Sequence, residues 1–190
     1  MCGNKYHATR KFIIFSQLYA NINLLLLRKE IFRTLLLILE PGEIFVHRNI
    51  ANSVTRDDIN SNAVLEYAIE HLGIQDIVIG GHTYCGGISS VIEQTKNKKG
   101  NNKKSKKISK WLLPIQRLYE ENRSEFDDIN DEYIKSRKLS EMNVKRVVDI
   151  VNGLDSIKSA RRKRKVVNVH GWIYLMEKGI FEDLKVTKSR

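Results

Sequence analysis

The feature that most constrains the fold is a short, nearly uninterrupted apolar run at residues 76–80, which reads DIVIG. Such a run is typical of a strand that is covered on both faces, as the strands of a parallel sheet are. A second strand is expected at residues 43–48, after the turn at 41–42, and an amphipathic helix lies between the two. This strand–helix–strand order predicts a right-handed βαβ unit within an α/β domain.

The rest of the pattern extends this domain. The first helix is expected to follow Ser61 as its cap, with its apolar face over residues 64–72. Further helices are predicted at residues 88–95, 108–121 and 141–151, and strands at residues 166–175 and 180–186. A tight turn at 177–179 joins these last two strands, so we expect a mostly parallel central sheet, flanked by helices, that finishes in a hairpin or edge addition.

The net charge of +11 comes from two local runs. Residues 96–110 contain many lysines and no acid, and residues 161–165 read RRKRK; without them the chain is close to neutral. We interpret the lysine run as a solvated loop. A polyanion-binding or nuclear-targeting role for RRKRK is an alternative. A nucleic-acid partner is not expected, because no aromatic residues alternate with the basic ones.

The cysteine content and the leucine-rich N-terminal region bear on the compartment. With only Cys2 and Cys85, a disulfide framework is not expected, and a reducing, cytoplasmic location is predicted. The apolar runs 24–27 and 35–39 are separated by charged residues, so no membrane span is expected. Apolar residues between 24 and 38 do fit helical spacing, which predicts an amphipathic helix there.

The stretch GGHTYCGG at residues 80–87 is the candidate functional site. It follows the strand at 76–80, and ligands of open α/β sheets bind at the carboxyl ends of strands. His82 and Cys85 offer the imidazole nitrogen and thiolate sulfur that zinc accepts, and flanking glycines allow a sharp turn. Two alternatives remain: a satisfied polar histidine beside a small buried cysteine, or a Cys85 nucleophile activated by His82.

Three segments in order resemble the β-class carbonic anhydrases: PGEIFVHRNIAN at 41–52, AVLEYAIEH at 63–71 and DIVIGGHTYCGGI at 76–88. Weaker similarity continues through WLLPIQRLY, EMNVKRVVDIV and VHGWIY to about residue 186. The resemblance implies a zinc enzyme that reversibly hydrates carbon dioxide to bicarbonate and a proton. It also implies a homodimer as the smallest assembly.

The same resemblance assigns roles to single residues. His82 and Cys85 correspond to two of the family's three zinc ligands, which are two cysteines and one histidine. Phe45 and Ile50 correspond to residues that line the carbon dioxide pocket, and Gly86 to a position where the backbone comes close to it. His47, on the strand near the site, is expected to make a structural hydrogen bond.

The family's first ligand belongs to a Cys-x-Asp-x-Arg segment that precedes the Pro-Gly turn, and this segment is missing. Residues 23–30 read NLLLLRKE, so the catalytic Asp/Arg pair has no counterpart. We therefore divide the chain into an aberrant N-terminal segment, residues 1–40, and a β-carbonic-anhydrase-like domain, residues 41–190. Three explanations compete: a frame or splice error in the first segment, an inactive homologue kept as a partner subunit or relic, or a thiolate from Cys2.

The missing segment also carries a prediction about stability. No first strand is evident before residue 41, and its loss from the middle of a parallel sheet would leave the neighbouring strands without hydrogen-bond partners. The sequence therefore predicts poor stability, which a thermal melt would test.

Overall fold

A computed structural model describes residues 12–17, 44–96 and 106–189. These residues form a five-stranded sheet in the order β2-β1-β3-β4-β5. Strand β1 is parallel to β2 and β3, β3 is parallel to β4, and β5 pairs antiparallel with β4. The predicted mostly parallel sheet with a closing hairpin is therefore confirmed. The strands are β1 (Phe12–Gln17), β2 (Ile44–Asn49), β3 (Asp76–His82), β4 (Asn168–Leu175) and β5 (Ile180–Asp183).

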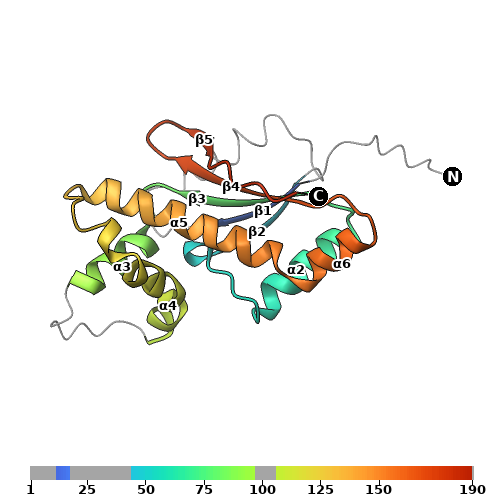
Figure 1. Cartoon of the computed structure of the whole chain (residues 1–190), viewed down its shortest axis with the longest axis horizontal. Helices are drawn as coiled ribbons and strands as arrows, with labels where there is room; N and C mark the ends of the chain where they lie inside the picture. The colour runs from blue at the N-terminus through green and yellow to red at the C-terminus, as the bar shows by residue number, and fades with distance from the viewer. Residues whose placement is uncertain (1–11, 18–43, 97–105, 190) are drawn as a thin grey trace.

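The helices cover the sheet in two groups. Figure 1 shows α5 lying along the sheet, with α3 and α4 together near one end of it and α2 and α6 near the other. The α-helices are α2 (Ile59–Glu70), α3 (Gly86–Lys96), α4 (Lys106–Glu121), α5 (Glu132–Asn152) and α6 (Asp155–Arg162). Two short 3-10 helices complete the described elements, η2 (Ile50–Asn52) and η3 (Arg123–Glu125).

Strand β1 corrects the expectation that the central strand is missing. Phe12–Gln17 lies between β2 and β3, and Ile13 pairs with Phe45 on one side and Ile77 on the other. The side chain of Ile13 is fully buried. The backbone groups of β2 and β3 therefore have partners in β1, so unpaired strands give no reason to expect poor stability. The helix predicted within residues 24–38 lies outside the described residues.

The starts of two helices differ from the prediction for local reasons, and a third helix was not predicted. Helix α2 is capped by Asp58, whose carboxylate accepts a hydrogen bond from the Asn60 N–H, and Ser61 already lies inside the helix. Helix α5 begins well before residue 141, because Asp131 caps it by accepting from the N–H groups of Tyr133 and Ile134. Helix α6 was not predicted, since its basic residues were interpreted only as a charge run.

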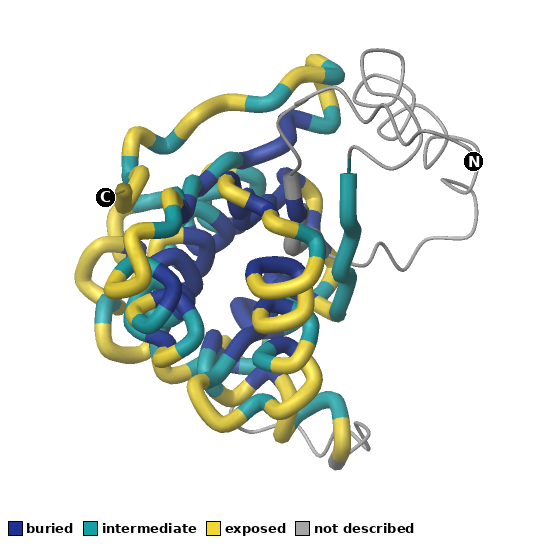
Figure 2. The backbone as a smooth tube through the Cα atoms, turned by 90° about the vertical axis from the view of Figure 1, so that its right-hand side faces the viewer, coloured by how far each residue is buried: buried dark blue, intermediate teal, exposed yellow. Residues whose placement is uncertain are grey.

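The core consists of two clusters of buried side chains. Figure 2 marks the buried residues in dark blue along the backbone. The larger cluster joins the sheet to α2, α5 and α6 and includes Ile13, Ile77 and Ile79. The smaller one joins α3, α4 and the first half of α5, and it contains Cys85. The candidate ligand Cys85 is thus part of a packed interior.

Helix α5 approaches the sheet closely because two strand positions are glycine. A Cβ atom at Gly81 would lie 2.7 Å from Val144 Cγ2, and one at Gly171 would lie 3.1 Å from Val144 Cγ1. Side chains at these positions would push the helix away from β3 and β4. The glycines therefore set the distance between α5 and the end of β3 that carries His82.

The RRKRK run is largely built into the fold. The Arg161 guanidinium donates to the Val167 carbonyl from both Nε and Nη2, at 3.0 and 2.8 Å. Lys163 and Lys165 both pair with the carboxylate of Glu70. These contacts give most of the run a structural role. Among the described residues, no helix is long and apolar enough to cross a membrane.

Candidate metal centre

The candidate centre lies where β3 ends and α3 begins. All seven residues of β3 are buried, and His82 is the last of them. Tyr84 then adopts a left-handed backbone conformation, with φ of 56°, and α3 starts at Gly86. The sharp turn brings both His82 and Cys85 to the carboxyl end of the strand, as the sequence predicts.

His82 is held as a neutral imidazole. The residue is only 7% exposed, and Nδ1 lies 2.7 Å from the Thr83 carbonyl oxygen. Because a carbonyl can only accept, Nδ1 carries the proton in this contact. Burial lowers the pKa of His82 to about 4; the bond to Thr83 opposes this shift and the charge of Arg48 adds to it. At neutral pH, Nε2 is therefore the basic nitrogen, as metal binding requires.

Cys85 is held as a protonated thiol in the absence of a metal. It is 1% exposed, and burial raises the pKa of its thiol to about 11, although the N–H groups of Ile88 and Gly87 donate to the sulfur and oppose the shift. A nucleophilic cysteine needs a lowered pKa, so this environment disfavours the nucleophile interpretation. A bound cation would displace the proton and use the same two N–H groups to hold the thiolate.

Other polar residues, which the sequence analysis did not single out, fix the loop after β2 against the end of β3. Asn143 Nδ2 donates to the Ala51 carbonyl at 2.9 Å, and Arg146 donates to Asn143 Oδ1 from Nε and Nη2. Asn52 Nδ2 donates to the Gly80 carbonyl at 3.4 Å. Asn143 and Arg146 lie in the EMNVKRVVDIV segment, but nothing in the sequence indicates which distant backbone groups they bind.

The three predicted pocket residues do not all meet within one chain. Ile50 lies beside the glycine pair, since its Cγ2 would be 3.6 Å from a Cβ at Gly87, and the space at Gly86 is open. The role expected of Gly86 at the pocket therefore stays a prediction. Phe45 is level with Ile77 in the sheet, about 16 Å along β3 from His82 at ~3.3 Å per residue. Its ring packs against Tyr67 and the larger core cluster.

His47 is level with Ile79 in the sheet, three residues before His82 on β3. Its Nε2 is 3.5 Å from the Ser61 hydroxyl, and burial lowers the pKa of its imidazole while the Asp58 carboxylate opposes that shift. This contact is the structural hydrogen bond that the sequence analysis expected.

The donor set matches zinc in two of the three family positions. A neutral imidazole and a thiol that can lose its proton are the ligand types zinc prefers. Ser16 of β1 is level with Gly80 of β3, so β1 reaches the same edge of the sheet, but Ser16 and Gln17 stand there and no cysteine follows before Cys85. Among residues 12–17, 44–96 and 106–189, no three histidine, cysteine or acidic side chains form a metal-binding group.

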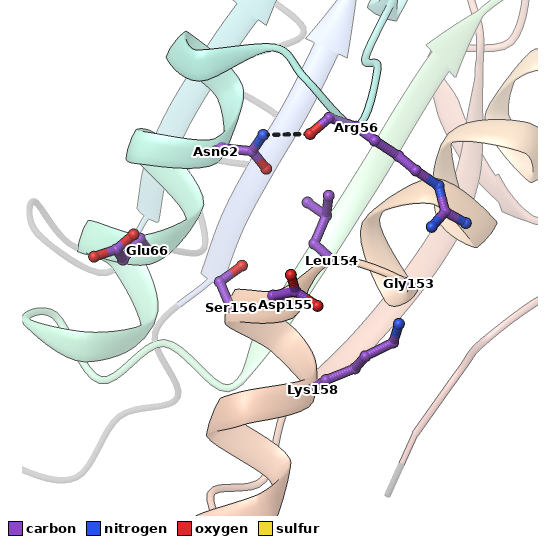
Figure 3. A pocket seen from close by; sticks show the side chains of 8 residues that line it. All are labelled: Arg56, Asn62, Glu66, Gly153, Leu154, Asp155, Ser156 and Lys158. Atoms are coloured by element: carbon purple, nitrogen blue, oxygen red, sulfur yellow. Dashed lines mark hydrogen bonds between the residues drawn. The ribbon is translucent and has the colours of Figure 1, made fainter.

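A separate cavity of about 300 Å³ lies between α2 and the start of α6 (Figure 3). The Asn62 amide donates to the Arg56 carbonyl oxygen at its upper rim. None of the candidate ligands or predicted pocket residues lines it, so it does not belong to the metal centre. Its lining consists of Arg56, Asn62, Glu66, Gly153, Leu154, Asp155, Ser156 and Lys158.

The fold and the donor pair together define an α/β protein with an imidazole and a thiol at one strand end. The model of the carbonic anhydrase family matches residues 31–181. A carbonic anhydrase of Emericella nidulans is 32% identical over 148 residues, which are 78% of this chain and 61% of the relative. A carbonic anhydrase of Candida albicans is 35% identical over 150 residues, covering 78% and 50% respectively.

Solved structures agree with these sequence relatives. A tetrameric β-carbonic anhydrase of Sordaria macrospora superposes with a TM-score of 0.77 at 27% identity, covering 94% of this chain and 82% of that one. The chain therefore belongs to the β-class carbonic anhydrase family, whose members are generally zinc enzymes. It spans only 50 to 61% of the length of the two curated relatives above.

Proposed function

We propose that this chain catalyses the zinc-dependent, reversible hydration of carbon dioxide to bicarbonate and a proton. The observation that carries the proposal is the state of the two candidate ligands at the end of β3. His82 is neutral with Nε2 as its basic nitrogen, and two backbone N–H groups donate to the sulfur of Cys85. Zinc, when bound, would supply hydroxide at neutral pH, because it lowers the pKa of bound water to about 7.

The protein's own residues would orient the ligands and admit the substrate. The Thr83 carbonyl keeps the proton on Nδ1 of His82, and the start of α3 holds the sulfur. Carbon dioxide is small and apolar, and the open space at Gly86 offers it room next to Gly87, where an added Cβ would lie 3.6 Å from Ile50 Cγ2.

We also propose that the working assembly is a homodimer or larger. Ile59 is 83% exposed and Tyr67 51% exposed, so α2 presents apolar side chains next to Phe45. An interface on this face would give Phe45 a way to reach the centre of a second copy, which it does not reach in its own chain. Sedimentation of the purified chain tests this: a monomer at all concentrations contradicts it. A cytoplasmic location remains proposed from the free thiol of Cys85.

A second candidate function is that of an inactive homologue that serves as a partner subunit. The observation that favours it is the absence of a cysteine near the end of β1, which leaves two protein ligands where the family uses three. Two ligands hold zinc less tightly than three, so this chain would keep the fold and the interface without the chemistry.

Zinc content and hydration rate, measured on the purified full chain, separate the two candidates. The proposed enzyme contains one zinc ion per chain and hydrates carbon dioxide in a stopped-flow indicator assay, and a chelator removes both properties. A folded chain with neither zinc nor activity supports the inactive homologue. A Cys2→Ser variant tests the remaining thiol: unchanged zinc content shows that Cys2 is not the third ligand.

A further inference from the structure

Thr83, which lies between the two candidate ligands, is fully buried and uses all of its polar groups. Its N–H donates to the Tyr174 carbonyl at 3.0 Å, and its own carbonyl accepts from Nδ1 of His82 at 2.7 Å. Its hydroxyl donates to Glu177 Oε2 at 2.8 Å and accepts from the Met176 N–H at 2.9 Å. A residue tied at each of these points cannot turn its peptide group freely.

Glu177 connects Thr83 to a second element. It lies in the turn between β4 and β5, 94 residues from Thr83 in sequence, and its Oε1 accepts a hydrogen bond from the Tyr133 hydroxyl near the start of α5. The ring of Tyr133 packs on that of Tyr84, with centroids 5.0 Å apart. The loop is thus held on both sides, at the hydroxyl of Thr83 and at the ring of Tyr84.

This arrangement explains how a strained loop stays ordered. Left-handed backbone at a non-glycine residue costs about 1–3 kcal/mol and persists only when the surroundings hold it. At Tyr84 the holding contacts are the ring of Tyr133 and, through Thr83, the carboxylate of Glu177. The direction of the Thr83 carbonyl, which accepts a hydrogen bond from Nδ1 of His82, depends on the same contacts.

We propose that Thr83 and Glu177 are positioning residues that fix the tautomer of His82 and thereby keep Nε2 as its metal donor. Glu177 fixes the Thr83 hydroxyl. The hydroxyl and N–H of Thr83 together fix the orientation of its peptide group. The Thr83 carbonyl then keeps the proton on Nδ1 of His82. The inference rests on the proposed function only where zinc affinity is measured, because the His82 tautomer can be measured separately in the metal-free protein.

The alternative is that Glu177 simply ties the β4–β5 turn to α5. Glu182 of β5 provides a matched control, since its carboxylate binds Arg137 of α5 at 3.0 Å and has no described contact with the loop of His82. If the role is only structural, Glu177→Gln and Glu182→Gln lower stability to similar extents and neither changes the imidazole.

The test measures the His82 tautomer by long-range ¹H–¹⁵N NMR in the metal-free full chain, and zinc affinity by chelator competition. The wild type is expected to carry its proton on Nδ1. Thr83→Val should populate the Nε2–H tautomer and weaken zinc binding about 10-fold, the lower end of second-shell effects. Thr83→Ser should restore both, and Glu177→Gln should shift both in the direction of Thr83→Val, while Glu182→Gln leaves both unchanged.

Each result decides the inference. A proton on Nε2 in the wild type overturns it, as does a folded Thr83→Val variant with the wild-type tautomer. A shifted tautomer in a chain that binds no zinc supports the positioning role and counts against the proposed function instead. A shift in Thr83→Val but not in Glu177→Gln confines the role to Thr83 and overturns that of Glu177.

Discussion

The two ends of strand β3 use histidine in opposite ways. At the carboxyl end, His82 is 7% exposed and donates a hydrogen bond from Nδ1–H to a backbone carbonyl. At the amino end, His170 of β4 is more exposed and binds side chains with both ring nitrogens, Nε2 to the Asp76 carboxylate at 3.1 Å and Nδ1 to the Thr187 hydroxyl at 3.0 Å. The first imidazole keeps Nε2 as its basic nitrogen, and the second links Asp76 to Thr187.

The difference shows what each edge of the sheet contributes. At the amino edge, the contact from His170 to Thr187 lies beside the bridge that pairs Val169 with Lys188, so it helps attach the C-terminal segment to the sheet. At the carboxyl edge, the chain turns sharply, and a buried imidazole and a buried thiol follow within three residues of each other. Ligands of open α/β sheets bind at the carboxyl edge. The histidine at that edge keeps a basic ring nitrogen, whereas the histidine at the amino edge uses both ring nitrogens in contacts with side chains.

The largest expected difference between the two ends is in metal binding. His82→Ala removes a proposed ligand, so its zinc affinity should fall by more than the 10- to 100-fold that second-shell changes typically cost. His170→Ala should leave zinc affinity unchanged, because that ring lies at the opposite edge. Chelator competition on both folded variants measures this. Equal losses in the two variants would contradict the assignment of the donor edge.

The second largest effect is expected in the pH dependence of stability, to which His82 should contribute. Burial lowers the pKa of His82 to about 4, so below about pH 6.5 the unfolded chain binds a proton that the metal-free folded chain does not. Stability should therefore fall as the pH drops from about 6.5 to about 4, by up to about 3 kcal/mol from this residue. Urea unfolding from pH 7 to pH 5 measures it.

The control for this effect is His82→Gln, which cannot take up the proton. Its free energy of unfolding should depend less steeply on pH than that of the wild type. In His170→Gln, the contribution of His82 to this pH dependence should remain. If the wild type and His82→Gln lose stability in parallel, the burial of His82 does not cause the slope.

Sequence predicts the carboxyl edge far better than the amino edge. The apolar run of β3 and the glycines around His82 and Cys85 are neighbours in the sequence. An apolar run followed by glycines indicates where a strand ends and a turn begins. The pairs at the amino edge join residues far apart in the chain, Asp76 with His170 and His170 with Thr187. The apolar residues around His170 in the sequence give no sign of such partners.

Strand β1 shows the same limit in the fold. FIIFSQ is a plausible strand by composition, but it lies outside the segments that resemble the family, and only its pairing with β2 and β3 reveals its central place. Local sequence likewise missed the start of α5, where the cap at Asp131 precedes a polar first turn. The network of Thr83 and Glu177 spans 94 residues and could not be inferred without the structure.

A smaller effect is expected from the carboxylate at the amino edge. Asp76 is buried, and its Oδ1 accepts hydrogen bonds from Asn168 at 2.9 Å and from His170. Asp76→Asn removes the charge while keeping the size, so it should lower the free energy of unfolding by about 1–3 kcal/mol. Urea unfolding measures the loss, and zinc affinity should not change. A variant as stable as the wild type would show that the carboxylate is not needed there.

The smallest effect is expected at the exposed end of the same chain of contacts. Thr187→Val removes the hydroxyl that meets Nδ1 of His170 and leaves the contact with Asp76 intact. Because water can replace the hydroxyl at this exposed site, the loss should be about 0.5 kcal/mol, at the lower end for a hydrogen bond. A double-mutant cycle with His170→Ala isolates the contact, since any effect of Thr187→Val on packing alone persists without the imidazole. A loss as large as that of Asp76→Asn would instead mean that the hydroxyl, rather than the buried carboxylate, holds the C-terminal segment on the sheet.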